Sequence, residues 1–291
     1  MGLSLAKDYP EATRIFEEAN EILGFNLSKL AWEGPEDELV LTKNAQPAIL
    51  VHSVAVYRVI RDRLGEVTMA SGHSLGEFSA HVAAGTLDFE QALRTVRLRG
   101  ELMYSAGASR SGTMAAVIGM TDREVESVCT RANNEVGTCV PANFNSEGQV
   151  VISGDVLGVE RAMELAEGMG ARRVVPLNVS GAFHSPLMAP AGEEFRGWLD
   201  KVHFCNPEFP VIANVTAEPV STADAARLLL VQQLTSPVRW ADSIRRMISL
   251  GADRFLELGP GSVLRALNRR NAKKLPCESL GESLDIETWE G

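Results

Sequence analysis

The feature that most constrains the fold is VTMASGHSLGEFSAHVAAG, residues 67–85, in which Ser74 stands between two glycines. Its first residues predict a short buried strand, and the small residues after the serine predict a helix that ends at Gly85. A strand, a G-x-S-x-G turn and a helix of small residues form the setting of a nucleophile elbow. The segment therefore predicts an α/β fold with Ser74 at a helix N-terminus, where free N–H groups stabilise negative charge. An ordinary turn serine is the alternative.

The order of the predicted elements changes in the middle of the chain. Residues 112–178 follow the order strand, helix, strand, strand, helix and strand, which is the βαββαβ order of a ferredoxin-like fold. Long helices and short strands resume from about Ser180. We therefore predict an α/β-hydrolase-like main subdomain formed by residues 1–111 and 180–291, with an inserted ferredoxin-like small subdomain at residues 112–179.

Helical periodicity is clearest in the first third of the chain. It predicts helices at 10–24, 46–65 and 88–106, and the second of these should begin at Pro47, since proline suits a first helical turn. The polar tail after Leu275 is expected to be loosely ordered.

Composition and charge exclude several classes of function. A net charge of −10 is a poor match to nucleic acid, and the 291 residues contain no apolar run close to the ~20 needed to cross a bilayer. The N-terminus lacks the pattern of a signal peptide. The four cysteines form no C-x-x-C pair, so we expect neither a disulfide scaffold nor a metal site. We expect a cytoplasmic protein.

A serine nucleophile needs a base, because a free hydroxyl is a weak nucleophile at neutral pH. His184 is the best candidate, because VSGAFHSPLM reads as a glycine-containing loop directly after a strand, where catalytic side chains gather. A surface histidine is the alternative interpretation. The remaining histidines lie beside the serine, on predicted helices or near a strand edge: His52, His73, His81 and His203.

No acidic residue has the setting of a third triad member. Asp155, Asp224 and Asp242 fall at predicted helix starts, where the N-cap is the better interpretation. Glu77 lies in the first turn after the elbow and is expected to be a structural residue that favours the helix dipole. A backbone carbonyl is therefore the alternative partner of the histidine.

Arg99 is the second informative residue. It is flanked by Leu98, Leu102 and Met103, which indicates that its guanidinium is partly buried. A buried arginine needs a carboxylate, and its planar fork suits a substrate carboxylate as well as an internal acid. The sequence leaves these two partners equally open. The GPG turn at 259–261 is better explained as a tight connection than as an anion site.

Several motifs in a fixed order resemble one known family. They are YPEATRIFEEANEILG, WEGPEDEL, QPAI, GHSLGE, RLRGELM, NFNS followed by GQVVISG, VSGAFHSPLM, QQLTSPVRW and LELGPG. The chain is similar to malonyl-CoA:acyl carrier protein transacylases and the related acyltransferase domains of fatty acid and polyketide synthases. The resemblance covers nearly the whole chain.

The resemblance implies a role for each matching residue. Ser74 would be the nucleophile that becomes malonyl-serine, His184 its base, and the backbone carbonyl of Gln233 the group that orients this histidine. Arg99 would hold the free carboxylate of the malonyl group, and Gln46 would border the site. The N–H of Leu75 would be an oxyanion donor, and Phe183 would crowd a methylmalonyl branch. Three further residues would lie near the acyl pocket: Met103, Asn145 and Met188.

The resemblance also implies the reaction and its partners. A ping-pong transfer would carry malonyl from malonyl-CoA through Ser74 to the phosphopantetheine thiol of acyl carrier protein, for fatty acid biosynthesis, with no cofactor. We expect a monomer that binds neither nucleic acid nor membrane. Because the carrier protein is usually acidic, a local basic patch should receive it, with these candidates: Arg172, Arg173, Arg265, Arg269, Arg270, Lys273 and Lys274.

One departure from the family pattern keeps other functions open. Family members usually begin with a strand and a G-Q-G-S-Q loop, and this sequence starts at MGLSLAKDYPE, downstream of both. Losing one oxyanion donor of such a loop typically costs ~10²–10³ in rate. The alternatives are therefore a serine esterase or thioesterase of similar fold, or a truncated, non-catalytic remnant that binds the carrier protein.

Overall fold

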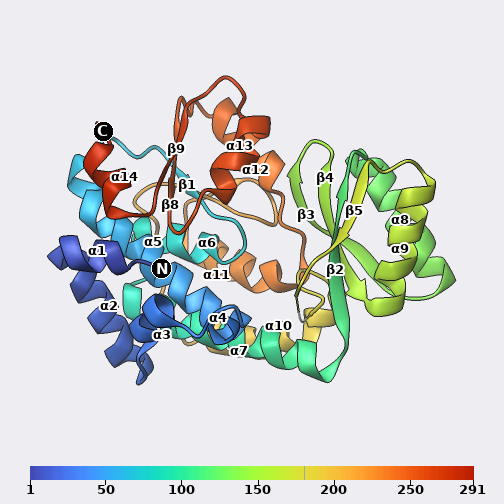
Figure 1. The fold of residues 1–291 in the computed structure, drawn as a ribbon, viewed down its shortest axis with the longest axis horizontal. Coiled ribbons are helices and arrows are strands. Elements are labelled where there is room, and N and C mark those ends of the chain that lie inside the picture. Colours follow the sequence, from blue (N-terminus) through green and yellow to red (C-terminus); the bar gives the residue numbers. More distant parts are fainter. Residues whose placement is uncertain (180) are drawn as a thin grey trace.

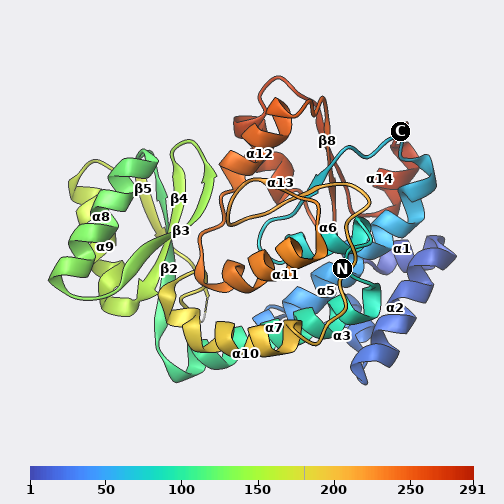
Figure 2. The same cartoon turned by 180° about the vertical axis from the view of Figure 1, so that it is seen from behind.

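The computed structural model describes residues 1–179 and 181–291 of the chain. Figure 1 shows an elongated molecule in which a small four-stranded unit lies at one end of a larger, mostly helical part. Figure 2 shows the same arrangement from behind, with helices α8 and α9 on the outer side of the small sheet in both views. The fold is mixed α/β with two subdomains, as the sequence predicts.

Helices dominate the first hundred residues. Their bounds are α1 Leu3–Asp8, α2 Pro10–Leu23, α3 Leu27–Glu33, α4 Glu36–Leu39, α5 Thr42–Ile60, a 3₁₀ turn Arg61–Arg63, α6 Gly76–Ala83 and α7 Phe89–Ser109. The three predicted long helices are present as α2, α5 and α7. The prediction that the second begins at Pro47 is wrong, because α5 begins at Thr42 and holds this proline in its interior.

The strands of the main subdomain are short. Strand β1 (Ala70–Ser71) pairs in parallel with β6 (Val211–Ile212), and β6 pairs antiparallel with β7 (Pro219–Val220). A second, parallel pair joins β8 (Phe255–Leu258) to β9 (Cys277–Leu280). The strand predicted at 67–71 is thus reduced to its last two residues, which lead directly into the serine turn.

The C-terminal part adds further helices to the main subdomain. They are the 3₁₀ turn Pro186–Met188, α10 Ala189–Leu199, α11 Ala223–Gln232, the 3₁₀ turn Gln233–Thr235, α12 Trp240–Ser249, α13 Val263–Asn271 and α14 Ser283–Thr288. The prediction of a loose tail after Leu275 is wrong. Strand β9 extends a sheet there, and Ile286 and Trp289 are buried in the largest core cluster.

The small subdomain has the predicted βαββαβ order. Its elements are β2 Gly112–Ile118, α8 Asp122–Glu135, β3 Cys139–Ser146, β4 Gln149–Asp155, α9 Val156–Gly168 and β5 Arg173–Pro176. The sheet order is β3-β4-β2-β5, and all three pairings are antiparallel, which is the ferredoxin-like arrangement. Its helices and strands enclose an apolar cluster of their own.

The separate sheet and the separate core support our division of the chain at residues 112 and 179, which stays a prediction. Ser180, where the second part of the main subdomain would begin, lies outside the described residues. The two parts meet where the amide N–H of Phe144 on β3 donates to the carbonyl of Val238, and the N–H of Val238 donates to the carbonyl of Ala142. In the part of the chain that the structure describes, no helix is long and apolar enough to cross a membrane.

Candidate active site

The turn between β1 and α6 brings the backbone unusually close to itself. A Cβ added at Gly72 would lie 1.9 Å from the carbonyl carbon of Gly76, so only glycine fits there. Ser74 between them has φ 50, in the left-handed region that non-glycine residues rarely adopt. Such strain in a G-x-S-x-G turn that leads into a helix is the geometry of a nucleophile elbow.

His184 lies against the serine, although 110 residues separate them. Its Nε2 is 2.8 Å from Ser74 Oγ, and its Nδ1 is 2.9 Å from the carbonyl oxygen of Gln233 and 3.2 Å from that of Ser236. A carbonyl can only accept, so Nδ1 carries the proton and Nε2 is free to accept one from the hydroxyl. The structure therefore supports His184 as base and the Gln233 carbonyl as its orienting group.

The electrostatic surroundings keep this imidazole neutral. Burial, and after it the positive charge of Arg99, lowers the pKa of His184 to about 3, although the hydrogen bond to the Gln233 carbonyl acts in the opposite direction. At neutral pH the ring is therefore unprotonated, which is the state that a general base needs before the reaction.

Arg99, on α7, is fully buried and points at the same hydroxyl. Its Nη2 donates to Ser74 Oγ over 3.1 Å and to Gln233 Oε1 over 2.8 Å, and its Nη1 donates to Gln46 Oε1 over 2.5 Å. Burial lowers its pKa to about 10, an effect that Glu77 opposes, so the guanidinium stays charged at neutral pH.

The partners of Arg99 favour one of the two interpretations left open by the sequence. They are neutral amides and a hydroxyl, and none of the ion pairs of the described residues includes this guanidinium. A buried cation without a carboxylate in direct contact is poised to receive one from a ligand. The geometry thus supports a carboxylate-binding role over an internal ion pair.

The side chain of Gln233 connects the other groups, which the sequence did not reveal. Its Nε2 donates to the carbonyl of Ser74 over 3.0 Å and to Glu77 Oε2 over 2.5 Å, while its Oε1 accepts from Arg99. Together with its carbonyl contact to His184, this one residue touches the elbow, the arginine and the base. Only its backbone role was predicted.

Glu77 was predicted as a structural residue that favours the helix dipole, and in the fold it also joins the polar contacts of the site. It lies in the first turn of α6 but is only 1% exposed, and its Oε2 also accepts from the amide of Asn214 over 3.2 Å. Burial raises its pKa to about 7, against the hydrogen bonds from Gln233 and Asn214 and the charge of Arg99. It does not contact His184, so it is no triad acid.

Asn214 is a residue of the site that the sequence analysis missed. Its Oδ1 accepts the amide of Ser74 over 2.7 Å, and its Nδ2 donates to the carbonyl of Gly72 over 2.7 Å. The available signal was a polar residue directly after the short apolar run VIA, two positions beyond β6. With the Ser74 amide occupied, the next amide, that of Leu75, has no acceptor among the described residues and is free to bind an oxyanion.

The residues predicted near the acyl pocket do not all lie together in the structure. Met103 Sδ lies 3.3 Å from Gln46 Nε2, beside Arg99, which agrees with a place at the acyl end. Asn145 instead contacts His73, whose Nε2 is 2.8 Å from its Oδ1. Two others remain predictions: Met188 is buried, and the half-buried ring of Phe183 packs over Gly181.

The other histidines and the acids predicted as N-caps lie outside the group of contacts around Ser74. His52 Nε2 meets the carbonyl of Gly281 at 2.7 Å, and His203 is exposed. Both ring nitrogens of His81 are buried and have no hydrogen-bond partner among the described residues. Asp155 caps α9, as predicted, by accepting from the Gly158 amide. The other two acids predicted as N-caps lie inside the first turns of their helices instead: Asp224 and Asp242. Within residues 1–179 and 181–291 no group of His, Cys, Asp and Glu could hold a metal ion.

Known proteins resemble this chain along nearly its whole length. The family model described as acyl transferase domain matches residues 1–284. A malonyl CoA-acyl carrier protein transacylase of Bacillus subtilis is 42% identical over 287 residues, which are 99% of this chain and 90% of that protein.

Solved structures agree with the sequence comparison. An acyl carrier protein S-malonyltransferase from Vibrio cholerae is 39% identical, with a TM-score of 0.95 over 99% of this chain and 94% of that chain. A malonyl-transacylase in complex with its type II PKS acyl-carrier protein is also 39% identical, with a TM-score of 0.94 over 99% of this chain and 93% of that chain.

Proposed function

Because this chain belongs to the family of acyl transferase domains, we propose that it transfers a malonyl group from malonyl-CoA to the phosphopantetheine thiol of acyl carrier protein. The observation that carries this proposal is the meeting of two groups, a base and a cation, at one hydroxyl oxygen. Ser74 Oγ lies 2.8 Å from the neutral nitrogen of His184 and 3.1 Å from the charged Arg99. The first contact activates a nucleophile, and the second offers a cation to an acyl chain that ends in a carboxylate.

The first half of the reaction forms an ester on the enzyme. Ser74 Oγ attacks the thioester carbonyl while its proton passes to Nε2 of His184, and the amide of Leu75 stabilises the oxyanion. The C–S bond then breaks, and the coenzyme A thiolate leaves with the proton from His184. Arg99, whose Nη1 is held by Gln46 Oε1 at the border of the site, binds the far carboxylate of the malonyl group throughout.

Substrate binding makes the base stronger. The charge of Arg99 is one of the causes that lower the pKa of His184. When the malonyl carboxylate binds the guanidinium, it neutralises that charge, so the pKa of His184 rises just when the imidazole must accept a proton. A substrate without a free carboxylate cannot produce this effect.

The second half reverses the first with a different thiol. The carrier thiol gives its proton to His184 and attacks the malonyl-serine carbonyl, and the ester C–O bond breaks as Ser74 Oγ takes the proton back. The product is malonyl-carrier, and the enzyme returns to its starting state. We propose that this reaction serves fatty acid biosynthesis.

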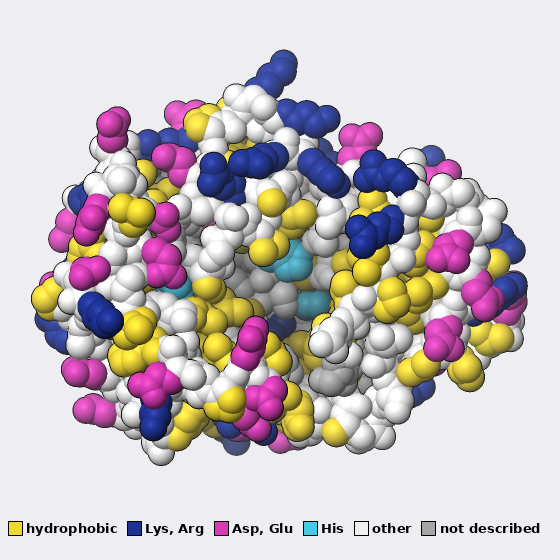
Figure 3. Space-filling view, viewed as in Figure 1, with side chains coloured by type: hydrophobic (Ala, Val, Ile, Leu, Met, Phe, Trp, Pro, Cys, Tyr) yellow, Lys and Arg dark blue, Asp and Glu magenta, His cyan; other side chains and the backbone are white. Residues whose placement is uncertain are grey.

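The face around the site suits an acidic carrier protein. Figure 3 shows histidine side chains at the bottom of a hollow and a band of Lys and Arg side chains above it, over the C-terminal helices and the edge of the small subdomain. One of the basic candidates lies at this boundary: Arg270 Nη1 on α13 donates to Gln149 Oε1 on β4 of the small subdomain. We propose that a monomer receives the carrier here.

The proposed compartment is the cytoplasm. All four cysteines are free thiols, and two of them, Cys129 and Cys139, are buried side by side with sulfurs 3.7 Å apart. Two thiols this close that form no disulfide fit a reducing compartment.

Mass spectrometry of the enzyme and the carrier tests the function. With malonyl-CoA alone, Ser74 should gain one malonyl group, and holo-carrier should then remove it and become malonyl-carrier. The Ser74→Ala variant should do neither. Free malonate without malonyl-carrier would instead identify an esterase or thioesterase, and the absence of any acyl-enzyme would identify a carrier-binding remnant.

A further inference from the structure

A proline interrupts the hydrogen bonding of α5 close to the site. In an α-helix the carbonyl of Lys43 would accept from the amide of residue 47, but that residue is Pro47 and has no N–H. A carbonyl left without a donor in a packed first turn is costly, so another donor is needed.

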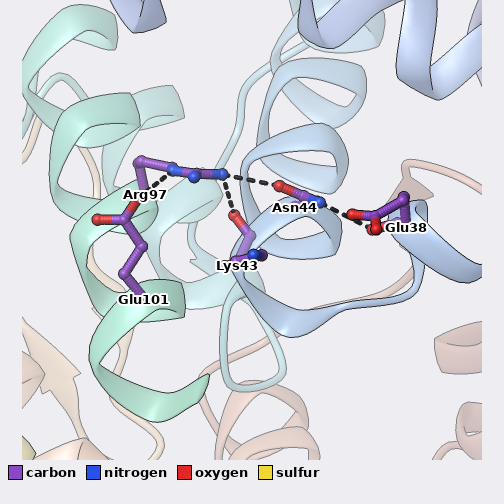
Figure 4. A network of polar contacts seen from close by, with 5 residues as sticks. All are labelled: Glu38, Lys43, Asn44, Arg97 and Glu101. Carbon is purple, nitrogen blue, oxygen red and sulfur yellow. Dashed lines mark hydrogen bonds and ion pairs between the residues drawn. The ribbon is translucent and has the colours of Figure 1, made fainter. Parts of the chain in front are cut away.

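Arg97 of α7 supplies this donor. Its Nη1 donates to the carbonyl of Lys43 over 2.9 Å and to Asn44 Oδ1 over 2.8 Å (Figure 4). Its Nε pairs with Glu101 one turn later on the same helix, at 2.6 Å, and Asn44 Nδ2 donates to the carbonyl of Glu38 over 2.8 Å. One guanidinium thus links the side of α7 to the interrupted turn of α5.

The two helices are in very close contact at this point. A Cβ added at Gly100 would lie 2.7 Å from the Cα of Lys43 and 2.8 Å from the carbonyl oxygen of Thr42. Gly100 follows Arg99 directly, so the backbone contact and the site arginine belong to the same turn of α7. Any shift of the first turn of α5 therefore changes its position relative to Arg99.

Gln46 is the residue on which such a shift would act. Its Nε2 donates to Thr42 Oγ1 over 2.7 Å, which turns its Oε1 toward Arg99 Nη1 at 2.5 Å. The amide orientation thus depends on the first turn of α5, the turn that Arg97 holds. Arg97 itself is partly exposed and touches none of the reacting groups.

We propose that Arg97 is a positioning residue that replaces the hydrogen bond missing at Pro47, fixes Gln46 against Arg99, and so sharpens selection of an acyl chain with a free carboxylate. This inference rests on the proposed malonyl transfer. Charge-assisted hydrogen bonds such as those from Arg97 are the strong ones in proteins. Loss of these contacts would let the Gln46–Arg99 pair drift from the carboxylate without removing either residue.

The test compares Arg97→Gln with Arg94→Gln, a matched control on the same helix whose exposed arginine pairs with Glu90 four residues away. Acylation of Ser74 is measured with malonyl-CoA and with acetyl-CoA. For Arg97→Gln we expect kcat/KM for malonyl-CoA to fall about tenfold, because small misplacements at a site are costly, with acetyl-CoA unchanged. The control should match the wild type. An equal loss for both acyl donors would show a merely structural role and overturn the proposal.

Restoring the missing donor gives a second test. Pro47→Ala supplies an N–H for the Lys43 carbonyl, so the double variant Pro47→Ala/Arg97→Gln should recover most of the malonyl preference. Equal losses from Arg97→Gln in both backgrounds would contradict the repair mechanism. If Arg97→Gln does not fold, Arg97→Lys replaces it, since it keeps the charge but loses the forked contact.

Hydrogen exchange separates this inference from the proposed function. The amides of residues 42–50 should exchange faster in Arg97→Gln than in Arg94→Gln, whatever reaction the enzyme catalyses. A wild-type protein that forms no malonyl-Ser74 would refute the proposed function, whereas unchanged exchange in this segment would refute the role of Arg97 alone.

Discussion

The small subdomain and the site region of the main subdomain are built in opposite ways. In the small subdomain, β2 pairs with β4 over seven consecutive residues, and the helices and sheet enclose an apolar cluster. In the site region, β1 and β6 have two residues each, yet the adjoining core holds Arg99, Glu77 and His184 at 4% exposure or less.

This difference in construction shows that the small subdomain is built for stability and the site region for the orientation of its polar groups. Apolar burial stabilises a fold without regard to direction, and it suffices for the small subdomain. Buried charges gain little net stability, because desolvation offsets their attraction, but they hold defined orientations. The buried polar groups of the site region therefore add less stability than apolar side chains would, but they already point at Ser74 Oγ.

The largest expected effect lies in the site region. We predict that His184→Ala lowers the rate of malonyl-Ser74 formation by ~10⁴-fold or more, because the serine loses its base. Stopped-flow acylation with malonyl-CoA measures this rate. His203→Ala, at an exposed histidine, is the control and should behave as the wild type. A loss of less than tenfold would mean that another group deprotonates Ser74.

Arg99→Ala should have the next largest effect. We expect kcat/KM for malonyl-CoA to fall ~10²–10³-fold, because the carboxylate would lose its charged partner, while acetyl and longer acyl groups transfer better than in the wild type. Competition between malonyl-CoA and acetyl-CoA measures the preference, with Arg94→Ala as the control. Unchanged malonyl selectivity would show that this cation does not bind the substrate carboxylate.

The same contrast explains how much the sequence could predict. Periodicity is a local property, so the βαββαβ order and the long helices α2, α5 and α7 were predictable. The serine turn was also predictable, because its glycines answer a local steric need. The tail was not, because β9 forms by pairing with β8, and the polar sequence after Leu275 carries no sign of that partner.

The polar contacts of the site were beyond local patterns. Glu77 was predicted only as a structural residue at a helix start, and its contact with Gln233 joins residues 156 apart in the chain. The donor to the Lys43 carbonyl, Arg97, is 54 residues away. In both cases the two groups lie far apart in the chain, so only the fold shows which group needs a partner and which residue supplies it.

A core substitution in the small subdomain should separate stability from activity. Ile152→Ala, at a fully buried position on β4, should lower the free energy of unfolding by ~2–5 kcal/mol through a cavity. Leu157→Ala, at a side chain on α9 that is 64% exposed, should change it by less than ~0.5 kcal/mol. Denaturant unfolding measures both, and kcat under native conditions should not change. A parallel loss of kcat would show that the two regions are coupled.

The smallest expected effect concerns the buried carboxyl of the site region. The folded protein raises the pKa of Glu77 from 4.5 to about 7, chiefly through burial, so the folded state binds its proton more tightly than the unfolded state. The stabilisation from this proton is therefore complete below pH 4.5 and is lost as the pH rises through 7. Gln at this position keeps an acceptor for Gln233 but cannot ionise.

We therefore predict that the stability of the wild type falls relative to Glu77→Gln by ~2 kcal/mol between pH 5 and pH 7.5. Urea unfolding of both proteins at several pH values measures the difference, and taking the difference cancels the titrations that they share. If the two plots of unfolding free energy against pH stay parallel, the pKa of Glu77 is not raised. The destabilisation from buried charge then comes from other groups of the site. If the two stability curves converge as the pH falls or cross as it rises, ionisation of Glu77 destabilises the site region.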